Sequence, residues 1–238
     1  RAHAAGDRSA ALPSAHTIAA VFGNTVQIGI PLIAGVFGEA GLGIHVTLVS
    51  VHALVLLSVL TALVELDLAR ARARHDASGQ LIKTLSLTVR NTVIHPVVLP
   101  VLGGLAWNLS GLRLPAVLDE TLALLGTAVA PLCLVLIGLS LAYTHVHGAW
   151  RAAAAITVLK LVVQPVLVLG VARFGFGLRG LPLTVVVMLA TLPCGSNALI
   201  FAQRYRAHEA ETTAAIVLST FAFVVTAPLW LAALALLG

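Results

Sequence analysis

The sequence predicts an all-α membrane protein that crosses the bilayer several times and contains two broken helices. Of its 238 residues, 59% are hydrophobic and 10% are charged, whereas about a quarter of an average soluble domain is charged. Its apolar runs reach the roughly 20 residues that one helical crossing requires. Two of these runs carry proline, glycine and short polar residues at their middle, where an unbroken spanning helix would lose backbone hydrogen bonds.

The two interruptions lie near opposite ends of the chain. One is residues 191–198, Thr-Leu-Pro-Cys-Gly-Ser-Asn-Ala, and the other is residues 22–31, Phe-Gly-Asn-Thr-Val-Gln-Ile-Gly-Ile-Pro. Backbone groups freed at membrane depth persist only where protein buries them or where they line an aqueous cavity. Each interruption alone is better explained by a proline kink, but two in corresponding parts of the chain favour the broken helices of a transporter binding site.

Taken in order, the chain begins with a polar stretch, residues 1–15, which we interpret as a loop. Seven predicted spans follow, separated by turns that are rich in glycine or charged residues. They are residues 16–37, 44–66, 85–109, 116–143, 152–172, 182–203 and 212–237. Residues 67–84 form the most charged connection, which we interpret as a solvated central loop.

Basic residues in the loops predict the orientation. They concentrate in the N-terminal segment, the central loop and the connections after the fourth and sixth spans, whereas the opposite side holds Arg113, Arg173 and Arg179. The positive-inside rule therefore places the central loop in the cytoplasm and Gly238 outside, in a cell inner (plasma) membrane. This orientation accounts for the net charge of +5, so nucleic acid is not an expected partner.

A weak internal repeat supports the transporter interpretation. Shifting the chain by 169 positions aligns Asn24 and Thr25 with Pro193 and Cys194, and Ser50 with Ser219. In both copies, a broken span leads through a short turn into an unbroken one. Because equivalent spans are five apart, the two copies have opposite orientations, as in the inverted repeats of many secondary transporters.

Three segments resemble the auxin efflux carrier family, which includes plant PIN-type carriers and bacterial organic-anion transporters. They are residues 23–32, with Gly-Asn-Thr and Gly-Ile-Pro-Leu; residues 159–165, with Leu-Lys-Leu and Gln-Pro; and residues 192–205, with Leu-Pro-Cys-Gly-Ser-Asn followed by Phe-Ala-Gln-Arg-Tyr. The resemblance covers nearly all of the chain after about residue 15. It implies two inverted repeats of five helices, with crossing broken helices at the fourth position of each.

On this plan the chain holds seven of an expected ten transmembrane helices and is truncated at its N-terminus. Residues 1–15 are a cytoplasmic loop remnant, and residues 16–66 are the last two helices of the first repeat. Residues 67–84 are the cytoplasmic linker, and residues 85–238 are the five helices of the second repeat. The departure from ten helices leaves open whether this chain transports by itself.

The candidate substrate-binding residues lie at the two breaks and on the fifth span. Short polar side chains at a break can contact a ligand, and the following half-helix presents N–H groups and a positive dipole end that suit a carboxylate. The alternative is that these side chains only cap the broken helix ends. The candidates at the breaks are Asn24, Thr25, Pro193, Cys194, Gly195, Ser196 and Asn197.

Lys160 is the only lysine or arginine near the middle of a span, where a lysine costs at least about 2.5 kcal/mol on insertion scales. We expect it to face a cavity or a partner, as the counter-charge of an anion or as a proton-linked group. A lysine that bonds to backbone freed near Pro165 is the alternative. Gln164 lies one turn later on the same face, and His52 and His95 are better explained as packing histidines than as proton carriers.

These observations favour a secondary transporter that moves small organic anions, such as carboxylates, by alternating access. The alternatives are an intramembrane enzyme, for which no His-Glu-x-x-His, Gly-x-Ser-x-Gly or aspartate pair is found, and a non-transporting membrane subunit. No Walker-type phosphate loop occurs, and the His145–His147 pair has no evident third ligand, so no cofactor or metal is expected. The expected partners are the anion and the lipid bilayer; coupling to H+ or Na+ and a homodimer stay open.

Overall fold

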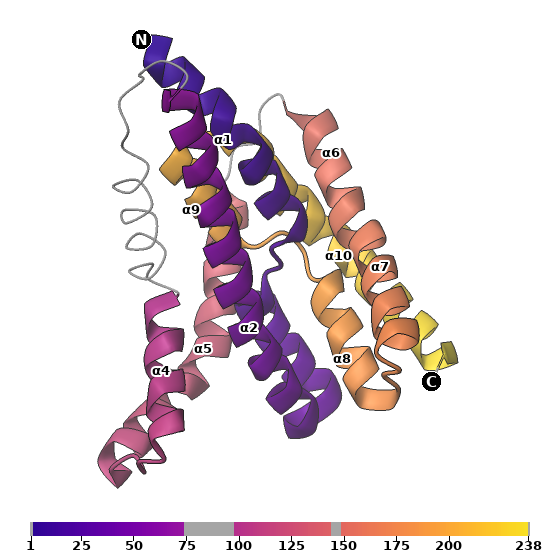
Figure 1. Ribbon diagram of the computed structural model, residues 1–238. Helices are drawn as coiled ribbons and strands as arrows, with labels where there is room; N and C mark the ends of the chain where they lie inside the picture. The colour runs from indigo at the N-terminus through magenta and orange to yellow at the C-terminus, as the bar shows by residue number, and fades with distance from the viewer. Residues whose placement is uncertain (1, 74–97, 144–148, 238) are drawn as a thin grey trace.

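The computed structural model describes residues 2–73, 98–143 and 149–237, and this part of the chain is helical apart from short connections (Figure 1). The elements include three single π-helical turns, η1 to η3. In chain order they are α1 (Ala2–Val21), η1 (Thr25–Gly29), α2 (Ile30–Ala73), α4 (Val98–Ser110), α5 (Ala116–Tyr143), α6 (Trp150–Val158), η2 (Leu159–Val163), α7 (Gln164–Gly170), η3 (Val171–Gly175), α8 (Gly180–Thr191), α9 (Ser196–Tyr205) and α10 (Glu209–Leu237).

Helix α1 begins at Ala2, so the loop conformation predicted for residues 1–15 is wrong. The stretch is polar, but it is rich in alanine, the residue with the highest helix propensity. The polar composition of this stretch therefore did not indicate a loop. From Ala11 onwards, α1 buries Ala11, Ala15, Ile18 and Ala19 in the main core.

Helix α2 contains two segments that meet at Gly38. Gly38 has φ 62° and ψ −159°, which is a backbone conformation that side chains with a Cβ rarely adopt. The chain reverses its direction within α2 (Figure 1), as predicted for a turn between the first two spans. That turn is confined to Gly38 and does not extend over residues 38–43.

The bounds of α5 equal those predicted for the fourth span. Helices α4 and α5 form a hairpin in which α4 contacts α2 and α5 contacts η1. The predicted third span, residues 85–109, lies partly outside the described residues, as do His95 and the central loop beyond residue 73. Much of the described hairpin surface is exposed, including Leu109, Val117 and Leu124.

Residues Trp150–Gly175 form one nearly continuous helix of 26 residues, composed of α6, η2, α7 and η3. In η2, the N–H of Gln164 reaches back five residues to the carbonyl of Leu159. Pro165 has no N–H to offer to Leu161, four residues earlier. The indole Nε1 of Trp230, on α10, donates to that Leu161 carbonyl at 2.9 Å.

The sixth predicted span is broken as expected, because α8 ends at Thr191 and α9 begins at Ser196. Helix α10 follows and packs against α6, α8 and α9, while α1 packs against α2 and α9. These elements bury one main hydrophobic core, to which α1, α2, α6, α9 and α10 contribute.

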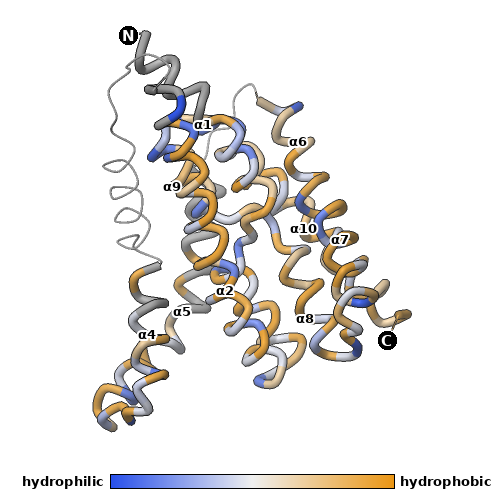
Figure 2. Tube along the Cα trace, viewed as in Figure 1, coloured by the Kyte–Doolittle hydropathy of each residue, from blue (hydrophilic) through white to orange (hydrophobic). Residues whose placement is uncertain are grey.

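Three helical segments are long and apolar enough to cross a membrane: Thr25–Leu68, Trp150–Gly175 and Glu209–Leu237. The first of these reverses at Gly38, and Ala11–Val21 and Gly180–Thr191 are shorter apolar helices. Hydrophobic residues predominate along the helices in Figure 2. The predicted all-helical class is thus confirmed, with three candidate spans among the described residues, whereas the number of seven spans stays a prediction.

The connections gather at two ends of the helical bundle. In Figure 1 the N-terminus and the start of α6 lie at one end, and the α4–α5 turn and the α7–α8 connection lie at the other. This alternation agrees with the order of predicted spans. Which of the two ends faces the cytoplasm is decided only by the charge argument, so the orientation stays a prediction.

Candidate functional site

The two breaks cross each other near the middle of the bundle, and their backbones are hydrogen-bonded. The N–H of Asn24 donates to the carbonyl of Pro193 at 2.8 Å, and the N–H of Gly195 donates to the carbonyl of Phe22 at 2.9 Å. Gly23 and Cys194 form an isolated antiparallel bridge between them. The prediction that the breaks lie together is confirmed, and each break satisfies backbone groups that the other one frees.

Close backbone contact at the crossing requires glycine. A Cβ on Gly195 would lie 2.8 Å from the carbonyl oxygen of Gly23 and 3.1 Å from the ring of Phe22. The φ of Gly195 is −84°, which other residues adopt readily. Space, and not backbone conformation, therefore selects glycine at this position.

The N-terminal ends of the two following half-helices meet at one polar cluster. Asn24 is the N-cap of η1, and its Oδ1 accepts a hydrogen bond from the N–H of Gln27 at 3.2 Å. The Oε1 atom of Gln27 accepts from Asn24 Nδ2 at 3.2 Å and from the Ser196 hydroxyl at 3.4 Å. Ser196 is the first residue of α9. Gln27 thus links the starts of η1 and α9, and Gln27, Ser196 and Asn197 are only partly buried.

The C-terminal ends of the two preceding half-helices are held by a second cluster. Lys160 Nζ donates to the carbonyl of Ala190, near the end of α8, at 2.9 Å and to Gln164 Oε1 at 2.6 Å. Gln164 Nε2 donates to the carbonyl of Val21, the last residue of α1, at 3.2 Å. Lys160 is 0% exposed, and a Cβ on Gly23 would lie 3.4 Å from its Nζ.

One residue of each break, Thr25 or Cys194, is held by a side chain from a later helix. The Nε2 atom of His45, on α2, lies 2.8 Å from the carbonyl of Thr25. The hydroxyl of Ser219, on α10, accepts a hydrogen bond from the N–H of Cys194 at 3.0 Å. Both His45 and Ser219 are 0% exposed. Because a carbonyl only accepts, His45 carries its proton on Nε2.

All predicted site residues lie at the crossing or beside it, and they divide into two sets. Asn24, Ser196 and Asn197 belong to the N-terminal side, and Lys160 and Gln164 belong to the C-terminal side. Thr25, Pro193, Cys194 and Gly195 are buried within the crossing itself. The ring of His52 stacks on Phe22 at 4.9 Å between centroids, so it packs beside the first break.

Sequence reasoning missed Gln27, His45, Ser219 and Trp230 as parts of this arrangement. Gln27 stands inside the first break, and its amide was a visible signal. His45 and Ser219 each follow a break by about 20 to 25 residues, as a helix that turns back alongside a break would place them. Trp230 had no local signal, since its partner Leu161 is 69 positions away.

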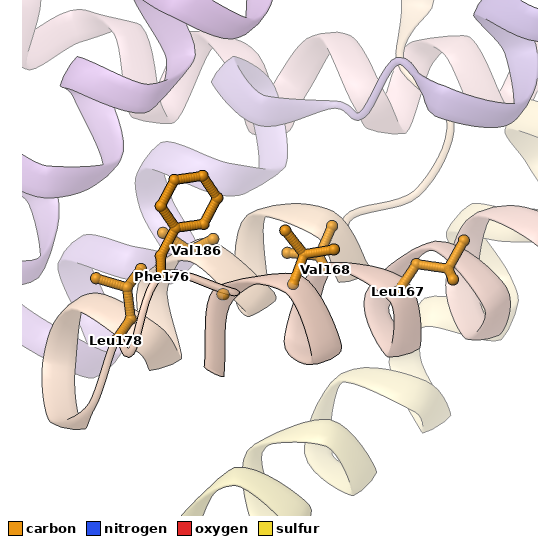
Figure 3. Close-up of a pocket in the computed structure, with 7 residues that line it drawn as sticks. Leu167, Val168, Phe176, Leu178 and Val186 are labelled. Atoms are coloured by element: carbon orange, nitrogen blue, oxygen red, sulfur yellow. The ribbon is translucent and has the colours of Figure 1, made fainter. Parts of the chain in front are cut away.

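A separate apolar pocket of about 280 Å³ lies between α7, η3 and α8 (Figure 3). Hydrophobic side chains alone line it: Leu167, Val168, Val171, Ala172, Phe176, Leu178 and Val186. It offers no group to bind a charged ligand, so the crossing is the better candidate for a polar substrate. Among the described residues, no cluster of histidine, cysteine and carboxylate side chains is suited to a metal ion.

Comparison with known proteins identifies the family of this crossed-helix chain. The family model described as membrane transport protein matches residues 7–231. The chain belongs to this family. It is a family of transporters and not of enzymes, so the intramembrane-enzyme alternative is set aside, and the resemblance to auxin efflux carriers is confirmed by the relatives.

Three relatives of this membrane transport protein chain show the breadth of the family. An uncharacterized transporter of Methanothermobacter thermautotrophicus is 25% identical over 90% of this chain and 66% of its own length. Auxin efflux carrier component 3a of Oryza sativa subsp. japonica is 27% identical over 65% of this chain and 25% of its own length. A Rhizobium meliloti protein, provisionally named a malonate transporter, is 27% identical over 58% of this chain and 43% of its own length. The chain therefore spans between a quarter and two thirds of the length of these relatives.

Proposed function

We propose that this chain belongs to a secondary active transporter that moves small organic anions, such as carboxylates, by alternating access. The observation that carries the proposal is the meeting of two half-helix N-termini, η1 and α9, at the partly accessible cluster of Asn24, Gln27 and Ser196. Helix N-termini carry free N–H groups and the positive end of the helix dipole. Two of them at one point favour a negatively charged ligand.

The proposed substrate-binding residues use the two sides of the crossing differently. The buried Asn24 and the partly accessible Ser196 and Asn197 offer polar groups on the N-terminal side. Thr25, Pro193, Cys194 and Gly195 shape the chain that carries them. Lys160 and Gln164 lie behind the crossing, where the amine contributes positive charge close to Gly23. The name of the Rhizobium meliloti relative, which refers to malonate, agrees with a carboxylate substrate.

An inverted repeat is proposed as the basis of alternating access. The crossing itself supports it, because Asn24 and Pro193 are bonded, as are Gln27 and Ser196, and each pair is 169 positions apart. Residues related by a two-fold axis can touch only on that axis. In such repeats the substrate is held near the midplane while one part of the protein moves against the other. Helix α5 contacts η1, which carries Gln27 of the polar cluster.

Uptake into proteoliposomes tests this function. The complete natural protein that contains this chain should accumulate at least one member of a radiolabelled panel of dicarboxylates and aromatic acids. Uptake should saturate and should be competed by the same unlabelled acid. Transport of neutral or cationic solutes, with no carboxylate transported or bound, would contradict the proposal. Repeating the uptake with H+ and Na+ gradients decides the coupling that the sequence leaves open.

A further inference from the structure

On the C-terminal side of the crossing, two helix ends with free carbonyl groups lie close together. The last carbonyls of α1 and α8 have no partner within their own helices, and each helix brings the negative end of its dipole to the same region. The α8 end is buried and the α1 end is partly buried, and unpaired backbone oxygens are costly in such surroundings. In many transporters with broken helices, such carbonyl ends coordinate a free alkali cation.

Here the amine of Lys160 occupies the place between these ends. It contacts the Ala190 carbonyl of α8 directly, and through Gln164 it is connected to the Val21 carbonyl of α1. One side chain pair therefore links the C-terminal ends of both half-helices. Among the described residues, no carboxylate pairs with Lys160, so neutral oxygens and helix ends surround its amine.

We propose that the Lys160 ammonium is a built-in cation for the crossing, and that it replaces a free Na+ or K+ between the two helix C-termini. Its three donors suit carbonyl and amide oxygens, and its Nζ lies beside Gly23, 3.4 Å from where a Cβ would stand. The crossing then forms and persists without any bound alkali ion. This role depends on the crossing geometry and not on which anion is transported.

Removal of the Lys160 side chain should leave a site for a free cation between the C-terminal ends of α1 and α8. In Lys160→Ala, the carbonyl oxygen of Ala190 and the Gln164 amide oxygen would face a small buried cavity. Na+, K+ or methylammonium can enter such a space, whereas choline is too large. Lys160→Met is the matched control, because it fills the cavity with a chain of similar length that carries no charge.

Thermal unfolding of the complete natural protein in detergent tests this proposal. The melting temperature of the wild type should be the same in Na+, K+ and choline chloride of equal ionic strength. Lys160→Ala should melt about 5 °C or more below the wild type in choline and recover part of this loss in Na+, K+ or methylammonium, with saturation. Lys160→Met should melt lower in all salts and recover in none.

Three results would overturn the proposal. They are a saturable Na+ or K+ stabilisation of the wild type, a Lys160→Ala protein that no small cation stabilises, and a Lys160→Met protein as stable as the wild type. If Lys160→Ala yields no folded protein, Lys160→Ser, which leaves the space open and adds one hydroxyl oxygen, is measured in the same salts. A Lys160→Ser protein that melts identically in choline, Na+ and methylammonium would count against the proposal in the same way.

Discussion

The backbone N–H of Asn24 and the carbonyl of Pro193 are joined at 2.8 Å, although the two residues lie in breaks near opposite ends of the chain. This bond, with the one from Gly195 to Phe22, holds two interrupted helices across each other inside an apolar bundle. The direction in which each half-helix runs then decides which helix ends gather on each side of the crossing. Both N-termini face one polar cluster, and both C-termini face Lys160 and Gln164.

Gly195→Ala should disrupt the crossing. The added methyl group would meet the Gly23 carbonyl oxygen at 2.8 Å, and overpacking of this kind typically costs about 1–3 kcal/mol. We expect a lower melting temperature and loss of anion uptake. Gly35→Ala is the matched control, since a Cβ there meets nothing within 4 Å, and it should leave both unchanged. If the two variants had equal melting temperatures and equal uptake, the close approach of the two breaks would affect neither stability nor transport.

Trp230→Phe should destabilise the helix that carries Lys160. The substitution keeps an aromatic ring but removes the donor to the Leu161 carbonyl, which Pro165 cannot satisfy. Leaving such a buried acceptor unpaired costs about 1–3 kcal/mol, and the melting temperature reports it. Trp150→Phe, at a position that is 51% exposed, should show no comparable change. A stable Trp230→Phe protein would indicate that the Leu161 carbonyl finds another donor.

Much of the crossing was predictable, because its signals are local. Pro193 and Gly195 interrupt an apolar run, and Asn24 precedes a helix start as an N-cap does. The direct contact of the two breaks followed from the requirement that freed backbone be satisfied. The structure bears out this contact.

The errors and omissions have a different origin. Residues 2–15 are helical because alanine-rich segments favour the helix even when polar residues interrupt them. His45, Ser219 and Trp230 act on partners that the fold brings close, and no local pattern names those partners. The division of the site residues into an N-terminal and a C-terminal side also required the direction in which each half-helix crosses.

Lys160→Gln should weaken anion binding, because it removes positive charge next to Gly23. Lys160→Arg should keep part of the affinity, since the charge persists while the donor geometry changes. Substrate affinity and melting temperature are measured together on the complete natural protein. If the folded Lys160→Gln protein bound the anion as tightly as the wild type, Lys160 would not be part of the substrate site.

The orientation can be tested by labelling with a membrane-impermeant thiol reagent. A cysteine at Ser78, within the central loop that the charge pattern places in the cytoplasm, should react only after cell lysis. A cysteine at Ser110, which is exposed at the α4–α5 turn, should react in intact cells. Cys133 is replaced by alanine in both variants, and Cys194 is buried. The opposite labelling pattern would invert the topology.

The central claim is that one anion binds where the N-termini of η1 and α9 meet. The most direct measurement is the affinity of the best transported carboxylate for Ser196→Ala and Asn24→Ala, each in the complete natural protein. The controls are Thr121→Ala and Asn108→Ala, at exposed helix positions. We predict that each site variant binds the carboxylate about tenfold more weakly, or about 1.4 kcal/mol, while the controls bind as the wild type does. Wild-type affinity in both site variants, with the folded state intact, would contradict the account.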